Sequence, residues 1–165
     1  MKPITALFKL VFFISIFFST YAFSETLSKI EIIGNDRISD ETIKLFISTN
    51  IKDEINDVKL NEILKDLYET DFFKNISLKF DNQILLINVQ ENPIIENIFY
   101  QGIKSKKILG LLKQVTLIKQ RSSYIESAIK KDKLKIENVL KSLGYYNSTL
   151  DIVINQSKNN LVSIT

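Results

Sequence analysis

The side chains that most often carry enzyme chemistry are missing from this sequence. It contains no His and no Cys, so it can form neither a Ser-His-Asp triad nor an ordinary zinc site. It has 19 acidic residues, but no pair of carboxylates is set apart by its spacing for acid–base work. A Gly-rich phosphate-binding loop is also missing. The composition therefore indicates a binding or scaffolding protein, and we expect no enzymatic activity, no metal and no other cofactor.

The first 24 residues have the three-part pattern of a secretory signal. Two lysines accompany an uninterrupted apolar run at Leu10–Phe18, and Ala22 and Ser24 are small residues at the positions that a signal peptidase reads. The run is about half as long as the ~20 residues that a membrane-spanning helix needs. We expect cleavage before Glu25 and export. An uncleaved signal anchor and a buried helix are the alternatives.

The charge balance changes when this segment is set aside. The whole chain has a formal net charge of +3, but the signal carries two lysines and no acid, which leaves 20 basic and 19 acidic residues. A nearly neutral surface with both signs interspersed gives no electrostatic footprint for nucleic acid. We therefore expect no nucleic-acid partner.

The sequence after the signal contains one pattern of elements written twice. In residues 27–92 the pattern predicts a strand at 27–33, a helix capped by Ser39, a second helix capped by Asp57, and strands at 76–80 and 85–89 around a turn at Asp81-Asn82. The two strands of this hairpin alternate apolar and polar residues. The second helix has Leu60, Ile63, Leu64 and Leu67 on one face.

Residues 94–165 repeat this order. We expect a strand at 94–100, a helix capped by Ser105, a long helix over 126–143 that Gly144 ends in the left-handed conformation, a strand through Leu150, Ile152 and Ile154, a turn at 156–160, and a third strand at 161–165. Phe72, Phe73, Tyr145 and Tyr146 occupy matching places in the two copies. We expect them to pack in the core and turns rather than to bind partners.

These elements predict an α+β fold of two tandem β-α-α-β-β units, each a three-stranded mixed sheet covered on one face by two helices. We expect a signal peptide at 1–24, a first unit at 25–92 and a second unit at 93–165 that is cut short in its last strand. The junction of Glu91, Asn92 and Pro93 is short and stiffened by proline, so we expect restricted motion between the units.

Three blocks of the sequence, in this order and spacing, carry a resemblance to a known family. They are LYETDFFKNISLKF (67–80), INVQENPIIENIFYQG (87–102) and LKSLGYYNSTLDI (140–152). They resemble the end of the second helix, the Glu-x-Pro junction and the Gly-Tyr turn of the POTRA repeats found in outer-membrane assembly factors of the BamA kind. That family places its repeats ahead of a membrane β-barrel, so we expect this chain to be an N-terminal piece without the barrel.

The resemblance implies a central third strand and a second strand at the sheet edge. An open edge exposes backbone N–H and C=O groups that an extended partner can pair with by β-augmentation. The candidate edge residues are Asn75, Ile76, Ser77, Leu78, Lys79, Phe80 and Asp81 in the first unit, and Ser148, Thr149, Leu150, Asp151, Ile152, Val153, Ile154 and Asn155 in the second. Lys79 and Asp81 have an equally weighted alternative role as guards against aggregation.

The function that the resemblance implies is that of a scaffold or receptor at the periplasmic face of the outer membrane. Its partners would be unfolded outer-membrane proteins and periplasmic or lipoprotein partners, with membrane contact only through the barrel of the parent family. Two alternatives remain open. One is a division protein of the FtsQ kind, which joins an N-terminal anchor to a POTRA unit, and the other is the POTRA part of a two-partner secretion transporter.

Overall fold

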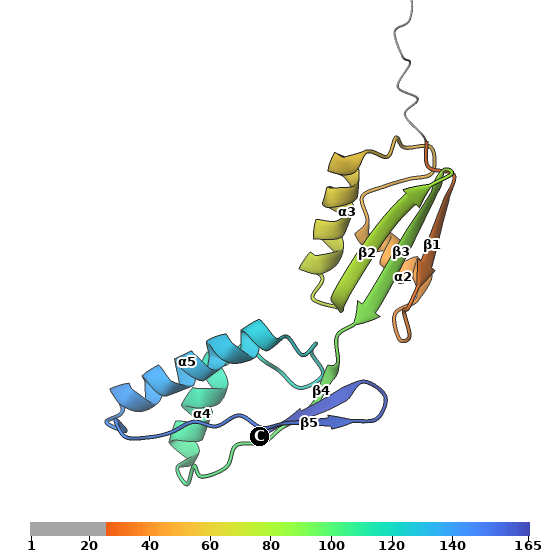
Figure 1. Ribbon diagram of the computed structural model, residues 1–165. Helices are drawn as coiled ribbons and strands as arrows, with labels where there is room; N and C mark the ends of the chain where they lie inside the picture. Colours follow the sequence, from red (N-terminus) through yellow and green to blue (C-terminus); the bar gives the residue numbers. More distant parts are fainter. Residues whose placement is uncertain (1–25) are drawn as a thin grey trace, which may run out of the picture.

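The structure is a computed structural model that describes residues 26–165. The expected signal and its cleavage residues, Ala22, Ser24 and Glu25, lie outside the described residues. Figure 1 shows two units joined by a short extended segment. The elements, in chain order, are β1 (Lys29–Ile33), α2 (Asp40–Phe46), α3 (Asp57–Glu69), β2 (Phe73–Asp81), β3 (Ile84–Glu91), β4 (Ile94–Ile98), α4 (Lys106–Val115), α5 (Glu126–Ser142), β5 (Ile154–Ser157) and β6 (Leu161–Ile164).

The sheet topology confirms the predicted fold class. The strand order is β1-β3-β2 in the first sheet and β4-β6-β5 in the second. In each sheet the central strand runs parallel to the first strand and antiparallel to the second. The chain therefore forms two three-stranded mixed sheets with two helices inserted after the first strand of each, as the repeated pattern predicts.

Local sequence explains where the helices begin and end. The hydroxyl oxygens of Ser39 and Ser105 accept hydrogen bonds from backbone N–H groups in the first turns of α2 and α4, so both predicted caps are confirmed. The prediction of Asp57 as a cap was wrong. Asn56 caps α3, and Asp57 is its first helical residue, where its charge suits the helix dipole. Gly144 follows α5 with φ +90°, as predicted.

The core of the first unit lies between the sheet and both helices. Leu85, Ile87 and Val89 alternate along β3, so they share one face of the sheet. They cluster with Ile43 of α2 and with Ile63 and Leu67 of α3. Both helices therefore cover this one face.

The second unit differs from the sequence prediction between α5 and β6. β5 begins at Ile154 and runs through Gln156 to Ser157, so the turn predicted at 156–160 begins two residues later, at Lys158, and ends at Asn160 as predicted. The reason is the register, which pairs Ile154 with Ile164. Counting backward along β5, Val153 exchanges hydrogen bonds with Thr165, and the positions opposite residues 148–152 lie beyond this last residue, so the strand predicted through Leu150 and Ile152 stays a prediction.

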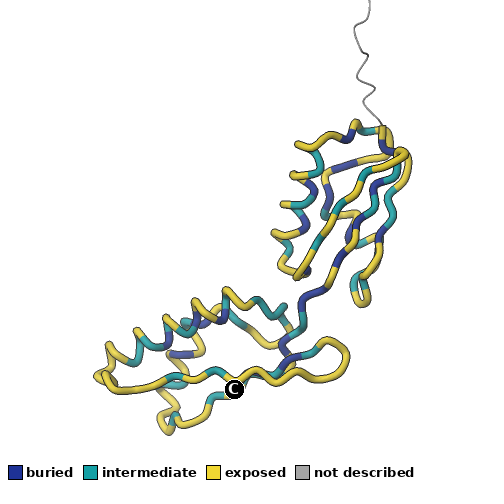
Figure 2. The backbone as a smooth tube through the Cα atoms, viewed as in Figure 1, coloured by how far each residue is buried: buried dark blue, intermediate teal, exposed yellow. Residues whose placement is uncertain are grey.

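The matching aromatic residues of the two units differ in exposure. Phe73, at the start of β2, is 3% exposed because its side chain belongs to the core cluster of the first unit. Tyr145 and Tyr146 are 49% and 76% exposed, so the prediction that they pack in the core was wrong. Figure 2 shows that the stretch between α5 and β5 is exposed along most of its length. In the described part of the chain, no helix is both long and apolar enough to cross a membrane.

Candidate functional site

The edge strand β2 presents a row of backbone groups that no other strand pairs with in the described chain. Asn82 and Gln83 both have positive φ (49° and 63°) and connect Asp81 to Ile84 as a tight hairpin turn. In such a hairpin the residues that flank the turn exchange hydrogen bonds, and the pattern alternates along the strand. The N–H and C=O groups of Leu78 and Phe80 therefore point outward, away from β3.

Side chains cover part of this edge. The backbone N–H of Ile76 points outward and donates to the Tyr68 hydroxyl of α3 at 3.3 Å. Lys79 Nζ lies 3.4 Å from Asp81 Oδ2 on the exposed face of the strand. The part of the edge that stays uncovered by these contacts is therefore the segment from Leu78 to Phe80. Its apolar side chains pack against the core of the first unit, so they do not project toward a partner.

The second sheet has a shorter edge. β5 is four residues long and exposed throughout. Of the candidate edge residues, Ile154 and Asn155 lie in this strand, whereas the stretch from Ser148 to Val153 lies outside it. The positions opposite residues 148–152 lie beyond Thr165, so the predicted edge from Ser148 to Val153 stays a prediction.

Glu91, at the end of β3, organises the junction between the units. Its Oε1 accepts hydrogen bonds from the backbone N–H groups of Asp36, Arg37 and Ile38 at 2.9, 2.9 and 3.0 Å. Its Oε2 lies 2.9 Å from Nε of Arg37, and the Glu91 side chain is only 2% exposed. The loop that leads into α2 is therefore held by the last residue of the central strand.

These contacts lower the pKa of Glu91. Burial alone would raise the pKa, because it disfavours the charged carboxylate. The backbone N–H groups of Asp36, Ile38 and Arg37, together with the positive charge of Arg37, favour the carboxylate and outweigh burial. The folded protein therefore keeps Glu91 ionised to a lower pH than an ordinary glutamate, because its pKa is lowered.

The rest of the junction is also hydrogen-bonded on both sides. The Asn92 amide nitrogen donates to the Asp71 carbonyl at 2.9 Å, and Arg37 donates to the Asn92 carbonyl at 2.8 Å. Pro93 accepts from the Tyr124 N–H at 2.7 Å. The backbone carbonyl groups of Asn92 and Pro93 are therefore both hydrogen-bonded within the chain.

Asn160, in the β5–β6 turn, links the second unit back to the first. Its side-chain nitrogen donates to the Glu91 carbonyl at 3.2 Å, and its own carbonyl accepts from the Ile94 N–H at 3.0 Å. One residue of the second unit thus bridges the last strand of the first unit and the first strand of the second.

Sequence reasoning missed these pairings. It placed Glu91 in the junction but found no partner for Arg37, because the two residues are 54 positions apart. The Glu-x-Pro motif was the one feature of the sequence that could have pointed to a structural role for Glu91. Within residues 26–165, no cluster of acidic side chains is arranged to hold a metal ion.

Comparisons with known proteins define the class of this module. Residues 25–92 match the family model of POTRA, the surface antigen variable number repeat. The structure is similar to the N-terminal domain of Omp85 from Thermosynechococcus elongatus, with a TM-score of 0.52 and 12% identity over 84% of this chain and 60% of that chain. At this identity the likeness concerns the fold alone. POTRA1-3 of the periplasmic domain of Omp85 from Anabaena gives a TM-score of 0.49 and 14% identity, over 84% of this chain and 59% of that chain.

One curated relative is more specific. The chain is 29% identical over 89 residues to the outer membrane protein assembly factor BamA of Neorickettsia risticii (strain Illinois). The match covers 54% of this chain and 12% of that protein. The resemblance to the POTRA repeats of BamA is confirmed.

Proposed function

We propose that this chain is a periplasmic part of an outer-membrane β-barrel protein assembly factor and acts as a scaffold or receptor there. The proposal rests on the match of its first unit to POTRA and on its similarity to BamA. In this proposal its partners are unfolded outer-membrane proteins or periplasmic and lipoprotein components, and it acts without a cofactor.

The observation that carries the mechanism is the open edge of β2. The outward N–H and C=O groups of Leu78 and Phe80 would pair with an extended segment, which adds a fourth strand to the first sheet. Pairing through the backbone does not depend on the partner's side chains, so one edge can accept many sequences. Lys79 and Asp81 keep this edge polar and so limit uncontrolled pairing between copies.

Hydrogen exchange distinguishes this mode of binding from other modes. The probe is a synthetic nine-residue peptide of alternating Val and Thr, which favour strands. In the free chain the outward amides of Leu78 and Phe80 exchange quickly, whereas those of Ser77 and Lys79 are protected by β3. Addition of the peptide should slow exchange selectively at Leu78 and Phe80.

Two substitutions at one position separate the backbone from the side chain. Leu78→Pro removes an outward N–H that makes no bond within the sheet, so proline is tolerated there. Leu78→Ala removes a similar amount of packing but keeps the N–H. We expect Leu78→Pro to weaken peptide binding by about tenfold or more relative to Leu78→Ala. Equal affinities in two folded variants would refute pairing at this edge.

A third variant tests the side chain that covers the edge. Tyr68→Phe removes the hydroxyl that accepts the Ile76 N–H and leaves the ring in place. The freed N–H extends the open edge by one hydrogen bond, so peptide binding should strengthen. Unchanged exchange of the Ile76 amide would show that the hydroxyl does not protect this end of the strand.

A further inference from the structure

The two units carry opposite net charges. Residues 26–92 contain 13 acidic and 8 basic residues, a net charge of −5, whereas residues 93–165 contain 5 acidic and 12 basic residues, a net charge of +7. The nearly neutral total of the chain after the signal is therefore the sum of an acidic unit and a basic unit. Charge of one sign concentrated on one folded unit attracts partners of the other sign.

Ion pairs within the second unit do not neutralise its positive charge. In the described chain each ion pair joins two residues of the same unit, and three of these pairs lie in the second unit. Nine of its 12 basic residues lie outside these pairs, against two of its five acidic residues, Glu96 and Asp151. The second unit therefore has a positive surface.

The excess charge is concentrated on α4 and the residues that flank it. Residues 104–121 contain six basic residues and no acidic residue. The matching segment of the first unit, residues 38–52, is balanced, with two acidic and two basic residues. The first turns show the difference, because α2 begins with Asp40 and Glu41 whereas α4 begins with Lys106 and Lys107.

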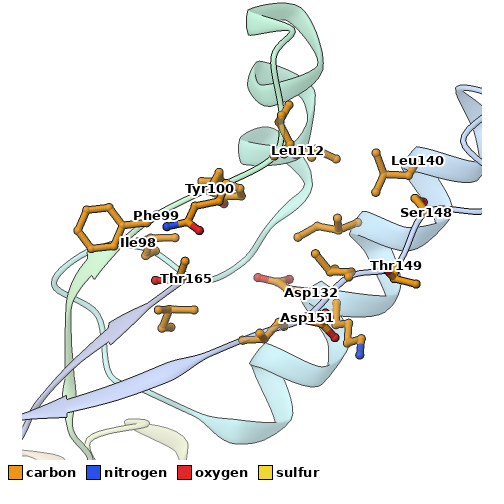
Figure 3. Close-up of a pocket in the computed structure, with 18 of the residues that line it drawn as sticks. Ile98, Phe99, Tyr100, Leu112, Asp132, Leu140, Ser148, Thr149, Asp151 and Thr165 are labelled. Carbon is orange, nitrogen blue, oxygen red and sulfur yellow. The ribbon is translucent and has the colours of Figure 1, made fainter.

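The lysines of α4 face solvent. Leu112 is fully buried, and Figure 3 shows it with Leu140 of α5 in the lining of the same pocket inside the unit. The other side of α4 is exposed, and we call it the α4 outer face. It consists of Lys106, Lys107, Gly110, Leu111, Lys113 and Gln114. None of these six residues lines the pocket.

The cations of the α4 outer face are available to a partner. Lys106 and Lys107 form no ion pair in the described chain, and the Lys113 amine lies 5.7 Å from the centre of the Tyr100 ring. An added Cβ at Gly110 would meet nothing within 4 Å, so no part of the described chain covers this face. Lys119 differs, because its Nζ donates to two carbonyls at the end of α4.

Apolar side chains are exposed among these cations. Leu111 is 36% exposed, and Leu117, just past the end of α4, is 59% exposed. Leucine beside lysine on an exposed helix is typical of helices that lie in a membrane interface, where lysine contacts the headgroups and leucine enters the apolar layer. This combination favours a lipid surface over a purely polar anion.

The choice of lysine over arginine agrees with this preference. Of the 12 basic residues in 93–165, 11 are Lys and one is Arg. The arginine fork suits one fixed carboxylate or phosphate, whereas lysine presents a compact charge on a flexible stem. Flexible point charges suit a fluid layer of headgroups, in which no single phosphate keeps a fixed position.

We propose that the α4 outer face docks on a lipid surface that carries anionic headgroups. The lysines approach the headgroups, and Leu111 enters the boundary of the apolar layer. Each lysine near such a surface contributes on the order of fivefold in affinity. The choice of a membrane as the partner rests on the function proposed above, which places the chain beside the outer membrane. The α4 outer face is a second binding surface, separate from the β2 edge.

Vesicle flotation measures this docking. The chain is used from Glu25 onward, because the apolar run at Leu10–Phe18 would itself enter vesicles, and both buried cores lie in the retained part. Vesicles of phosphatidylcholine and phosphatidylglycerol in equal amounts should bind the chain, whereas pure phosphatidylcholine should not. Raising NaCl from about 0.05 M to about 0.5 M should weaken binding at least about tenfold, since salt screens exposed charges. Equal binding to both kinds of vesicle would overturn the proposal.

Two double variants of equal charge locate the docking surface. Lys106→Gln with Lys107→Gln changes the α4 outer face, whereas Lys131→Gln with Lys141→Gln removes the same charge from exposed positions of α5. The first variant should bind vesicles at least about tenfold more weakly than the second. Circular dichroism checks that both remain folded. Equal losses in the two folded variants would mean that net charge alone governs binding, which contradicts docking through α4.

A second pair of variants tests the apolar contact. Leu111→Gln removes an exposed leucine from the α4 outer face and should weaken vesicle binding by about fivefold or more. Leu134→Gln removes a leucine of α5 that is 60% exposed, so it removes more exposed apolar surface and should still leave binding unchanged. A larger effect of Leu134→Gln would place the contact on α5 and overturn the assignment to α4.

Competition distinguishes lipid from other anions. A short DNA duplex and a polyglutamate peptide carry negative charge without an apolar layer, so both should bind more weakly than the anionic vesicles at the same salt concentration. Tighter binding of the duplex would assign the face to nucleic acid, and tighter binding of polyglutamate to an acidic polypeptide. Either result would overturn the lipid proposal.

The two binding surfaces can be tested separately. Leu78→Pro, at the β2 edge, should bind anionic vesicles as the original chain does, and the α4 double variant should bind the Val-Thr peptide normally. Loss of vesicle binding in a folded Leu78→Pro variant would contradict docking through α4. Absence of peptide pairing with intact vesicle binding would refute only the mechanism proposed for β2.

Discussion

The guanidinium Nε of Arg37 lies 2.9 Å from Oε2 of Glu91, and this ion pair joins the loop before α2 to the last residue of β3. The opposite carboxylate oxygen accepts three consecutive backbone N–H groups from the same loop. One buried carboxylate therefore fixes both a loop and the exit of the central strand. Its loss would affect the stability of the first unit and the geometry of the junction.

Glu91→Gln should destabilise the chain by about 1–3 kcal/mol, since it weakens several charge-assisted hydrogen bonds in a buried place. Urea unfolding followed by circular dichroism measures this change. Glu69→Gln is the matched control, because Glu69 forms an exposed pair with Lys65. Its effect should stay within about 0.5 kcal/mol. Similar losses in the two variants would argue against the special role of Glu91.

The lowered pKa of Glu91 predicts a specific dependence on pH. Above the ordinary value of 4.5 the carboxylate is charged in both the folded and the unfolded chain, and its full contribution to stability is present. As the pH falls through the lowered pKa of the folded state, protonation removes that contribution. The difference in unfolding free energy between the original chain and Glu91→Gln should therefore shrink in acid. A difference that stays constant below pH 4.5 would contradict this linkage.

Gly34→Ala should destabilise the first unit far more than Gly102→Ala destabilises the second. Both residues have positive φ, which costs an L-residue about 1–2 kcal/mol, but only at Gly34 does the new Cβ also collide with backbone. Thermal unfolding compares the two variants directly. Equal shifts in melting temperature would mean that β3 can move away from Gly34 at little cost.

Asn160→Gly should loosen the junction between the units. It removes the side-chain hydrogen bond to the Glu91 carbonyl and readily adopts the φ of +55° found at this position. Asn159→Gly is a close control, since its φ is +62° and, within residues 26–165, its side chain lacks the hydrogen bond to Glu91 that Asn160 makes. NMR relaxation should give similar tumbling times for the two units in the original chain and in Asn159→Gly, and separate times in Asn160→Gly. Independent tumbling in the original chain would contradict the expected restricted motion.

Local sequence was sufficient for most of the fold. Ser39 and Ser105 cap their helices because a side-chain oxygen three residues from an N–H needs no distant partner. Gly144 ends α5 for a similarly local reason, since glycine adopts positive φ without steric cost. The alternation in residues 76–80 and 85–89 predicted a hairpin because both strands and their turn lie within one short stretch of chain.

The tertiary structure decided what depends on distant partners. The turn at 156–160 was predicted from its residue types, but the register that pairs Ser157 with Leu161 keeps Gln156 and Ser157 in β5, so the turn begins only at Lys158. The partner of Arg37 was hidden for the same reason, because Glu91 reaches it only after the chain has folded through two helices and a hairpin. Alternation and capping are properties of neighbouring residues, whereas register and ion pairing are set by which distant segments come into contact.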